Sequence, residues 1–105
     1  MASEHFEYIK SRMKELGNIR FHSEILVEKI LSGETLKQIK AYNEYLYLVS
    51  DSVPNGVIIH SDTFILKGSP LSSFPHIPYE FTGHVIITSG NIPDFTIEFI
   101  RVTPE

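Results

Sequence analysis

The side chains best suited to chemistry in this sequence are histidines, which can serve as general bases or as metal ligands. They are His5, His22, His60, His76 and His84. His60 and Asp62 have the i, i+2 spacing that places two ligands on one face of a strand, and His84 falls in a later strand. Two ligands do not define a metal site, and Asp62 follows Ser61 at an expected turn, where Asp favours bonds to the local backbone. We therefore predict no metal and no cofactor.

The other common catalytic patterns are missing from the sequence. It has no cysteine, which excludes thiol catalysis, disulfides and cysteine-based metal sites. It also lacks a Gly-x-Ser-x-Gly elbow, a Walker loop, a dinucleotide fingerprint and an EF-hand pattern. Glu98 lies inside an expected strand, but its place between Ile97 and Phe99 indicates a residue that faces solvent. A cofactor-free enzyme is therefore the least favoured hypothesis.

The charges are distributed unevenly along the chain. Residues 1–44 hold seven Lys or Arg against seven Asp or Glu, whereas residues 45–105 hold two against six, so the net charge of -4 belongs to the second part. That part has no basic stripe that could neutralise phosphates, which argues against nucleic-acid binding. The first residues carry charges at short intervals and no long apolar run occurs, so we expect no secretory signal and no membrane span. A cytoplasmic protein is the simplest expectation.

The chain of 105 residues has the length of one domain, and we treat residues 1–105 as such. Its first element is the clearest. Apolar residues at helical spacing predict a helix from about Ser3 to Leu16, with Gly17-Asn18 as a left-handed stop. The stripe consists of Phe6, Ile9, Met13 and Leu16, and Lys10, Arg12 and Lys14 are expected on the outer face.

The segment from residue 22 to residue 44 is ambiguous. It can form two short helices, the second opened by a capping box at Thr35-x-x-Gln38. It can equally form two strands around a tight turn, because Ile25, Val27 and Ile30 are β-branched and a Ser-Gly pair follows. We favour the helices, since Glu, Lys, Gln, Leu and Ala dominate both segments.

From Tyr45 onward the pattern is that of strands. Residues 45–49 and 57–59 flank a Pro-Asn-Gly turn and are predicted to pair as a hairpin. A further strand covers residues 63–67, and residues 79–88 and 95–102 are predicted to form a final pair. The expected fold is therefore α+β, with N-terminal helices followed by an antiparallel meander of about five strands.

Several of these strands are apolar on both faces. Tyr45, Tyr47 and Val49 would line one face, and Leu46 and Leu48 the other. Helices can cover one face of the sheet, so something else must shield part of the second. The candidates are the proline-containing loop, a curved sheet that closes on itself, or another protein chain.

The loop between residues 69 and 79 contains three prolines and three large apolar side chains. These side chains can fold back over the core, or they can form a rigid patch that binds another protein. The candidate partner-binding residues are Phe74, His76, Ile77 and Tyr79.

Three hypotheses about function follow. The leading one is a non-catalytic protein-interaction or assembly module that self-associates. The second is a small-molecule carrier with an apolar cavity between curved sheet and helices, in which His60 and His84 would orient the ligand. The third is the cofactor-free enzyme.

Overall fold

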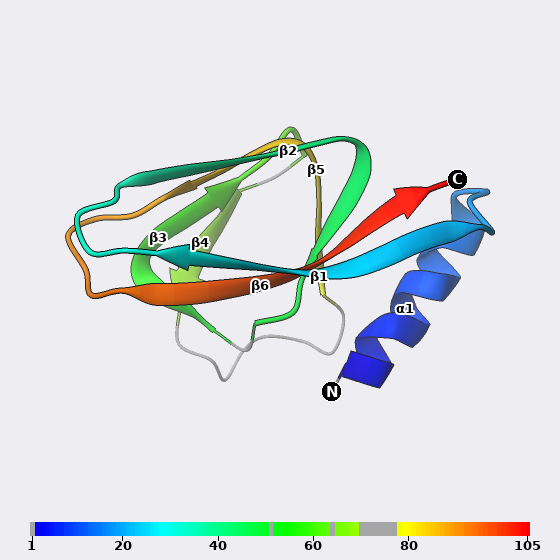
Figure 1. Ribbon diagram of the computed structural model, residues 1–105, viewed down its shortest axis with the longest axis horizontal. Helices are drawn as coiled ribbons and strands as arrows, with labels where there is room; N and C mark the ends of the chain where they lie inside the picture. Colours follow the sequence, from blue (N-terminus) through cyan, green and yellow to red (C-terminus); the bar gives the residue numbers. More distant parts are fainter. Residues whose placement is uncertain (1, 51, 64, 70–77) are drawn as a thin grey trace.

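One helix and six strands make up the part of the chain that the computed structural model describes, which is residues 2–50, 52–63, 65–69 and 78–105 (Figure 1). In chain order the elements are α1 (Ala2–Glu15), β1 (Phe21–Ile30), β2 (Leu36–Leu48), β3 (Val53–His60), β4 (Ile65–Ser69), β5 (Tyr79–Thr88) and β6 (Phe95–Pro104). The strands form one antiparallel sheet in the order β1-β6-β2-β5-β3-β4. The α+β class and the antiparallel sheet are confirmed, with a single helix and one strand more than expected.

The helix α1 ends as its sequence predicts. Gly17 has a positive φ of 80°, which glycine adopts without steric cost. Its amide donates to the Lys14 carbonyl and the Asn18 amide donates to the Met13 carbonyl, the two bonds of a Schellman motif. Ile9 and Met13 are fully buried against the sheet, whereas Phe6 and Leu16 of the predicted apolar stripe are 39% and 38% exposed. The packed face of the helix is therefore narrower than the predicted stripe.

The preferred helical interpretation of residues 22–44 is wrong, because both segments are strands. Ile30 and Ile39 are buried in the sheet's own core, and this burial outweighs the small helix preference of the neighbouring Glu, Lys and Gln residues. The strand alternative is confirmed, but the two strands do not pair with each other. The strand β6 lies between β1 and β2.

Strand neighbours also differ from those expected for 45–49 and for the last two strands. The strand β5 separates β2 from β3, and β2 separates β5 from β6. The long strand β2 pairs with β5 along most of its length and with β6 over Tyr45–Leu48. It therefore lies between two strands that were predicted to pair with each other. The predicted Pro-Asn-Gly turn is also wrong, because Pro54, Asn55 and Gly56 lie inside β3, at its register shift against β4. The pairing depends on which distant strand buries the apolar side chains.

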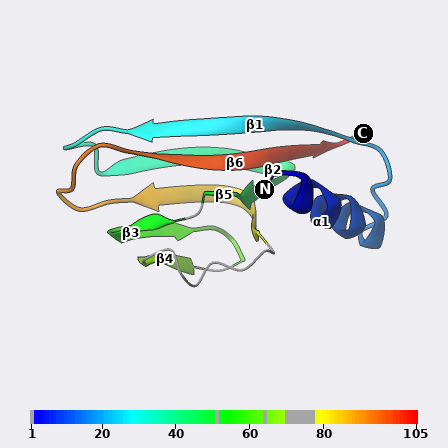
Figure 2. The same ribbon diagram turned by 90° about the horizontal axis from the view of Figure 1, so that it is seen from below.

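Both faces of the sheet are apolar, as predicted. The curl of the sheet covers one face, and α1 covers part of the other. Leu46, Leu48 and Phe99 belong to a buried cluster to which five strands contribute, so the sheet curls around its own side chains. On the opposite face, Tyr47 and Ile100 pack against α1 in a second cluster. Figure 2 shows α1 at one end of this outer face, with β1 and β4 at the two edges of the sheet.

Candidate functional site

The strand β1 forms a long free edge of the sheet. Its ten residues pair with β6 in an unbroken register from Phe21 opposite Pro104 to Ile30 opposite Phe95. On its other side no described strand pairs with it. A long regular edge of this kind offers a row of backbone donors and acceptors to an additional strand.

The backbone groups that point away from β6 can be assigned from a single hydrogen bond. The Glu105 amide donates to the Arg20 carbonyl at 3.0 Å, which makes these two residues a hydrogen-bonded pair of the ladder. Hydrogen-bonded pairs alternate along an antiparallel ladder, so the even-numbered residues of β1 bond to β6. The odd-numbered residues therefore direct their amide and carbonyl groups to the open edge.

Apolar side chains accompany these outward backbone groups. Ile25 is 59% exposed and Val27 is 54% exposed, and both lie on the face of the sheet that carries α1. Just beyond the two ends of β1, Ile19 is 80% exposed and Leu31 is 51% exposed. The edge thus combines free backbone groups with a broken line of exposed aliphatic side chains, as interaction surfaces do.

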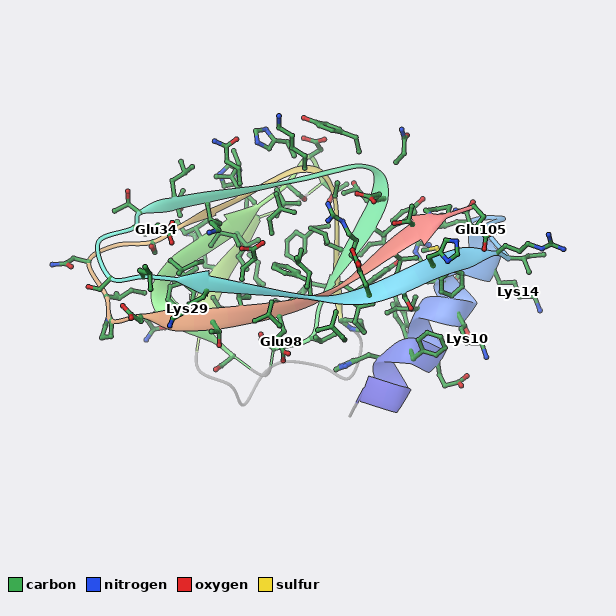
Figure 3. The ribbon with its side chains drawn as sticks, in the orientation of Figure 1. Lys10, Lys14, Lys29, Glu34, Glu98 and Glu105 are labelled. Carbon is green, nitrogen blue, oxygen red and sulfur yellow. The ribbon has the colours of Figure 1, made fainter. Side chains whose placement is uncertain are left out.

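A groove lies beside this edge where β1 begins. Its volume is about 390 Å³, and it is lined by Glu7, Lys10, Ser11, Lys14, Ile19 and Phe21. Phe21 contacts Phe6 of α1, with ring centroids 6.4 Å apart. Figure 3 shows Lys10 and Lys14 on α1 and Lys29 near the far end of β1. The groove between α1 and β1 therefore lies only at the end of the edge where β1 begins.

A polar network anchors α1 beside the edge. The Arg12 guanidinium donates to both oxygens of Glu80, at 2.9 and 3.2 Å, and the Tyr47 hydroxyl donates to Glu80 at 2.7 Å. Tyr47 is fully buried, and burial followed by its bond to Glu80 raises the pKa of the Tyr47 hydroxyl far above its ordinary value. The bonds to Glu80 likewise raise the pKa of Arg12. The network is satisfied within the chain, which indicates a structural role.

Arg12 corrects one expectation. The sequence pattern placed this residue on the outer face of the helix with Lys10 and Lys14, whereas it reaches across to Glu80 on β5. Nothing in the local spacing reveals this, because Glu80 lies 68 residues away in the chain.

A second recess lies at a bulge in β2, where residues 42–45 oppose Thr82 alone. It is an open hollow of about 620 Å³. Asn43 and Gly83 both have positive φ, and a Cβ on Gly83 would meet the Asp62 carboxylate, so this turn of the sheet requires glycine. The carboxylate of Glu44, which also lines the hollow, is held by Arg101 at 3.2 Å. These contacts account for the bulge as part of the fold.

The two histidines proposed to orient a ligand lie on neighbouring strands, His60 on β3 and His84 on β5. Their neighbours Ile59 and Val85 are fully buried in the inner cluster, so alternation places both histidines on the outer face. His84 Nε2 lies 2.6 Å from Gln38 Oε1 in an exposed contact. Their side chains therefore lie outside the apolar interior of the curled sheet.

The candidate partner-binding loop can be placed only at its end. Tyr79 begins β5 and packs, partly buried, against the inner cluster. Phe74, His76 and Ile77 lie outside the described residues. Tyr79 thus follows the expectation of a side chain that folds back over the core.

The helical interpretation favoured for residues 22–44 hides the free edge, because it removes β1 from the sheet. The exposed positions Ile25 and Val27 have i, i+2 spacing, which is the signal of one strand face.

Within residues 2–50, 52–63, 65–69 and 78–105, no three acidic or histidine side chains come together to hold a metal ion. No helix in that part of the chain has the length and apolar character needed to cross a bilayer. No protein-family model, curated protein or solved structure matches this chain.

Proposed function

We propose that this protein is a non-catalytic interaction module that self-associates by strand addition at the free edge of β1. The observation that carries this proposal is an unbroken ten-residue edge strand with Ile25 and Val27 more than half exposed. In strand addition the backbone bonds supply affinity, and alternate side chains supply specificity. Both components are available on β1 without rearrangement of the fold.

Strands that are apolar on both faces do not by themselves require an external partner. The curl of the sheet and the docking of α1 bury most of these side chains within the chain itself. An external partner is favoured by the apolar side chains that stay exposed along β1, next to backbone groups that β6 does not pair. The carrier and enzyme alternatives have no comparable observation in their favour among the described residues.

Sedimentation velocity over a concentration series tests the proposal. We expect the wild-type chain to shift from monomer to dimer as its concentration rises. Ile25→Lys should weaken this association roughly 100-fold, because each dimer would bury two unpaired ammonium groups at the new strand pair. The matched control is Ile65→Lys, which introduces the same charge at a residue that is 64% exposed on the opposite edge strand β4.

The control variant should associate as the wild type does. Wild-type protein that remains monomeric at millimolar concentration contradicts self-association. An equal loss of association in the two variants contradicts the assignment to β1 and points to a general effect of charge.

A further inference from the structure

We propose that two copies of this chain join their β1 strands antiparallel, with Ile25 of one copy opposite Ile25 of the other across a twofold axis. This inference rests on the proposed function and adds the geometry of the interface. The pairing would continue the six-stranded sheet of each copy into one sheet of twice that size. Its support comes from the positions of apolar side chains, charges and the groove along one edge.

In this register the numbers of two opposed residues add to fifty. The outward-directed odd positions then face one another, as backbone pairing between two edges requires. Ile25 meets Ile25, and Val27 meets Ser23 of the other copy, with Ile25 as its diagonal neighbour. Ile19 meets Leu31 just beyond the strand ends. All four exposed aliphatic residues along the edge are therefore brought into the interface.

Charges select this register over the adjacent ones. The even positions place His22 opposite Glu28, and Glu24 opposite Leu26. Shifting the strands so that opposed numbers add to fifty-two sets Glu24 against Glu28 twice. Shifting them the other way sets Glu24 against Glu24. Carboxylates directly opposite each other on a strand pair are destabilising, so the Ile25-centred register is the most favourable of the three.

The groove beside α1 receives the end of the other strand. Odd positions lie on the face that carries α1, as the contact between Phe21 and Phe6 shows. The other copy continues past Lys29, which lies opposite Phe21, to Leu31, which lies opposite Ile19 in the wall of the groove. Ile19 and Phe21 line this recess together with Glu7, Lys10, Ser11 and Lys14, so they offer the aliphatic Leu31 an apolar contact at the end of the edge.

The size of the interface sets the expected affinity. Residues 19–31 of each copy would take part, which is thirteen residues a side against the roughly 20–30 of a standard stable interface. We therefore expect a dimer that dissociates in the micromolar range, at roughly 8 kcal/mol of binding free energy. Such a dimer would be observable by concentration-dependent methods.

The absence of cysteine from the chain allows a direct test by disulfide trapping. Single-cysteine variants would be oxidised in a glutathione redox buffer at low micromolar concentration and analysed by non-reducing electrophoresis and mass spectrometry. Opposed residues in a hydrogen-bonded pair have Cα atoms about 5.5 Å apart, within the range that a disulfide spans. Ile25→Cys should therefore dimerise covalently by itself.

The Ser23→Cys and Val27→Cys variants make the register test independent of Ile25. Each alone should crosslink poorly, whereas an equimolar mixture should yield the heterodimer, at least about tenfold over either variant alone. Ile65→Cys on β4 is the control and should stay monomeric, since it lies on the opposite edge. Circular dichroism of each variant checks that the fold is kept.

One result would separate this inference from the proposed function, and two others would overturn both. If the wild type associates but Ile25→Cys crosslinks efficiently to Val27→Cys and not to itself, the register is wrong and self-association through β1 stands. If Ile65→Cys crosslinks instead, the interface lies at β4. A wild-type chain that stays monomeric at every concentration removes both proposals.

Discussion

The two edges of the sheet differ in how well they are protected against further pairing. The strand β4 has five residues and pairs with β3 through a register shift between Val53 and Ile58. Short and irregular edges are among the means by which proteins prevent strand addition. The strand β1 has twice that length and no register shift. The comparison indicates that β4 is an edge closed by its sequence, whereas β1 is an edge left open.

The surroundings of the two edges reinforce this difference. A Cβ on Gly68 of β4 would meet the backbone carbonyl of Pro54, so the irregular part of β3 packs directly against Gly68. Beside β1, in contrast, α1 supplies a groove and is held in place by the Arg12–Glu80–Tyr47 network. An accessible strand with a fixed neighbouring recess supports the proposed strand addition at β1.

The largest expected effect is on the free energy of unfolding, and it compares the packing of the sheet next to β1 with its packing at β4. Phe99 is fully buried, packs edge-on against Phe81, and pairs with Leu26 of β1. Phe99→Ala should lower the free energy of unfolding by about 3–5 kcal/mol, because it removes a large core side chain and leaves a cavity. Leu66→Ala on β4 should cost about 1 kcal/mol, because Leu66 is only partly buried against the same cluster.

Urea unfolding followed by circular dichroism measures both values, at a concentration low enough to keep each variant monomeric. Losses of equal size would show that the β4 side is as firmly packed as the β1 side. The comparison of the two edges would then rest on strand length and regularity alone.

An intermediate effect is expected from the network that holds α1 beside β1. Glu80→Ala leaves the buried Tyr47 hydroxyl without its acceptor and Arg12 without its bidentate partner. We expect a loss of about 1–3 kcal/mol in the free energy of unfolding and a lower helical signal in circular dichroism, since α1 would detach.

The matched control is Glu98→Ala, which removes an exposed carboxylate from β6 and should change stability by less than about 0.5 kcal/mol. Self-association should weaken with Glu80→Ala, because the groove beside β1 depends on α1. Unchanged helicity in Glu80→Ala would show that the apolar contacts of Ile9 and Met13 are sufficient to dock the helix.

The smallest effect is expected from the ionisation of Tyr47, which leaves the free energy of unfolding unchanged at neutral pH and lowers it in alkali. Burial, and then the bond to Glu80, raise the pKa of Tyr47 in the folded chain above its unfolded value of about 10. The folded state therefore keeps this proton where the unfolded state loses it. The contribution to stability is complete below about pH 10 and declines as the pH rises beyond that value.

Urea unfolding at a series of alkaline pH values measures this dependence, with Tyr47→Phe as the comparison. The phenylalanine variant should lose less stability on going into alkali than the wild type does. The same decline in both proteins would assign the loss of stability in alkali to groups other than Tyr47.

Local patterns in the sequence predicted the parts of the fold that depend on neighbours in the chain. The stripe through Ile9 and Met13 and the Gly17 stop define α1, and the alternation of Leu46, Tyr47 and Leu48 predicts two buried faces. The candidate site was not among these predictions. Ile25 and Val27 have the spacing of a strand face, but the Glu and Lys residues around them are also good helix formers, and this is typical of an exposed edge strand.

The sequence by itself determined that this chain begins with an amphipathic helix and that its strands from Tyr45 onward must be covered on both sides. Only the tertiary structure decided that β1 lies at an edge, that β6 separates it from β2, and that Arg12 meets Glu80. The reason is physical: helix ends and side-chain alternation are set by residues a few positions apart. Strand order and ion pairs depend instead on contacts between residues such as Ile25 and Ile100, which only the folded chain brings together.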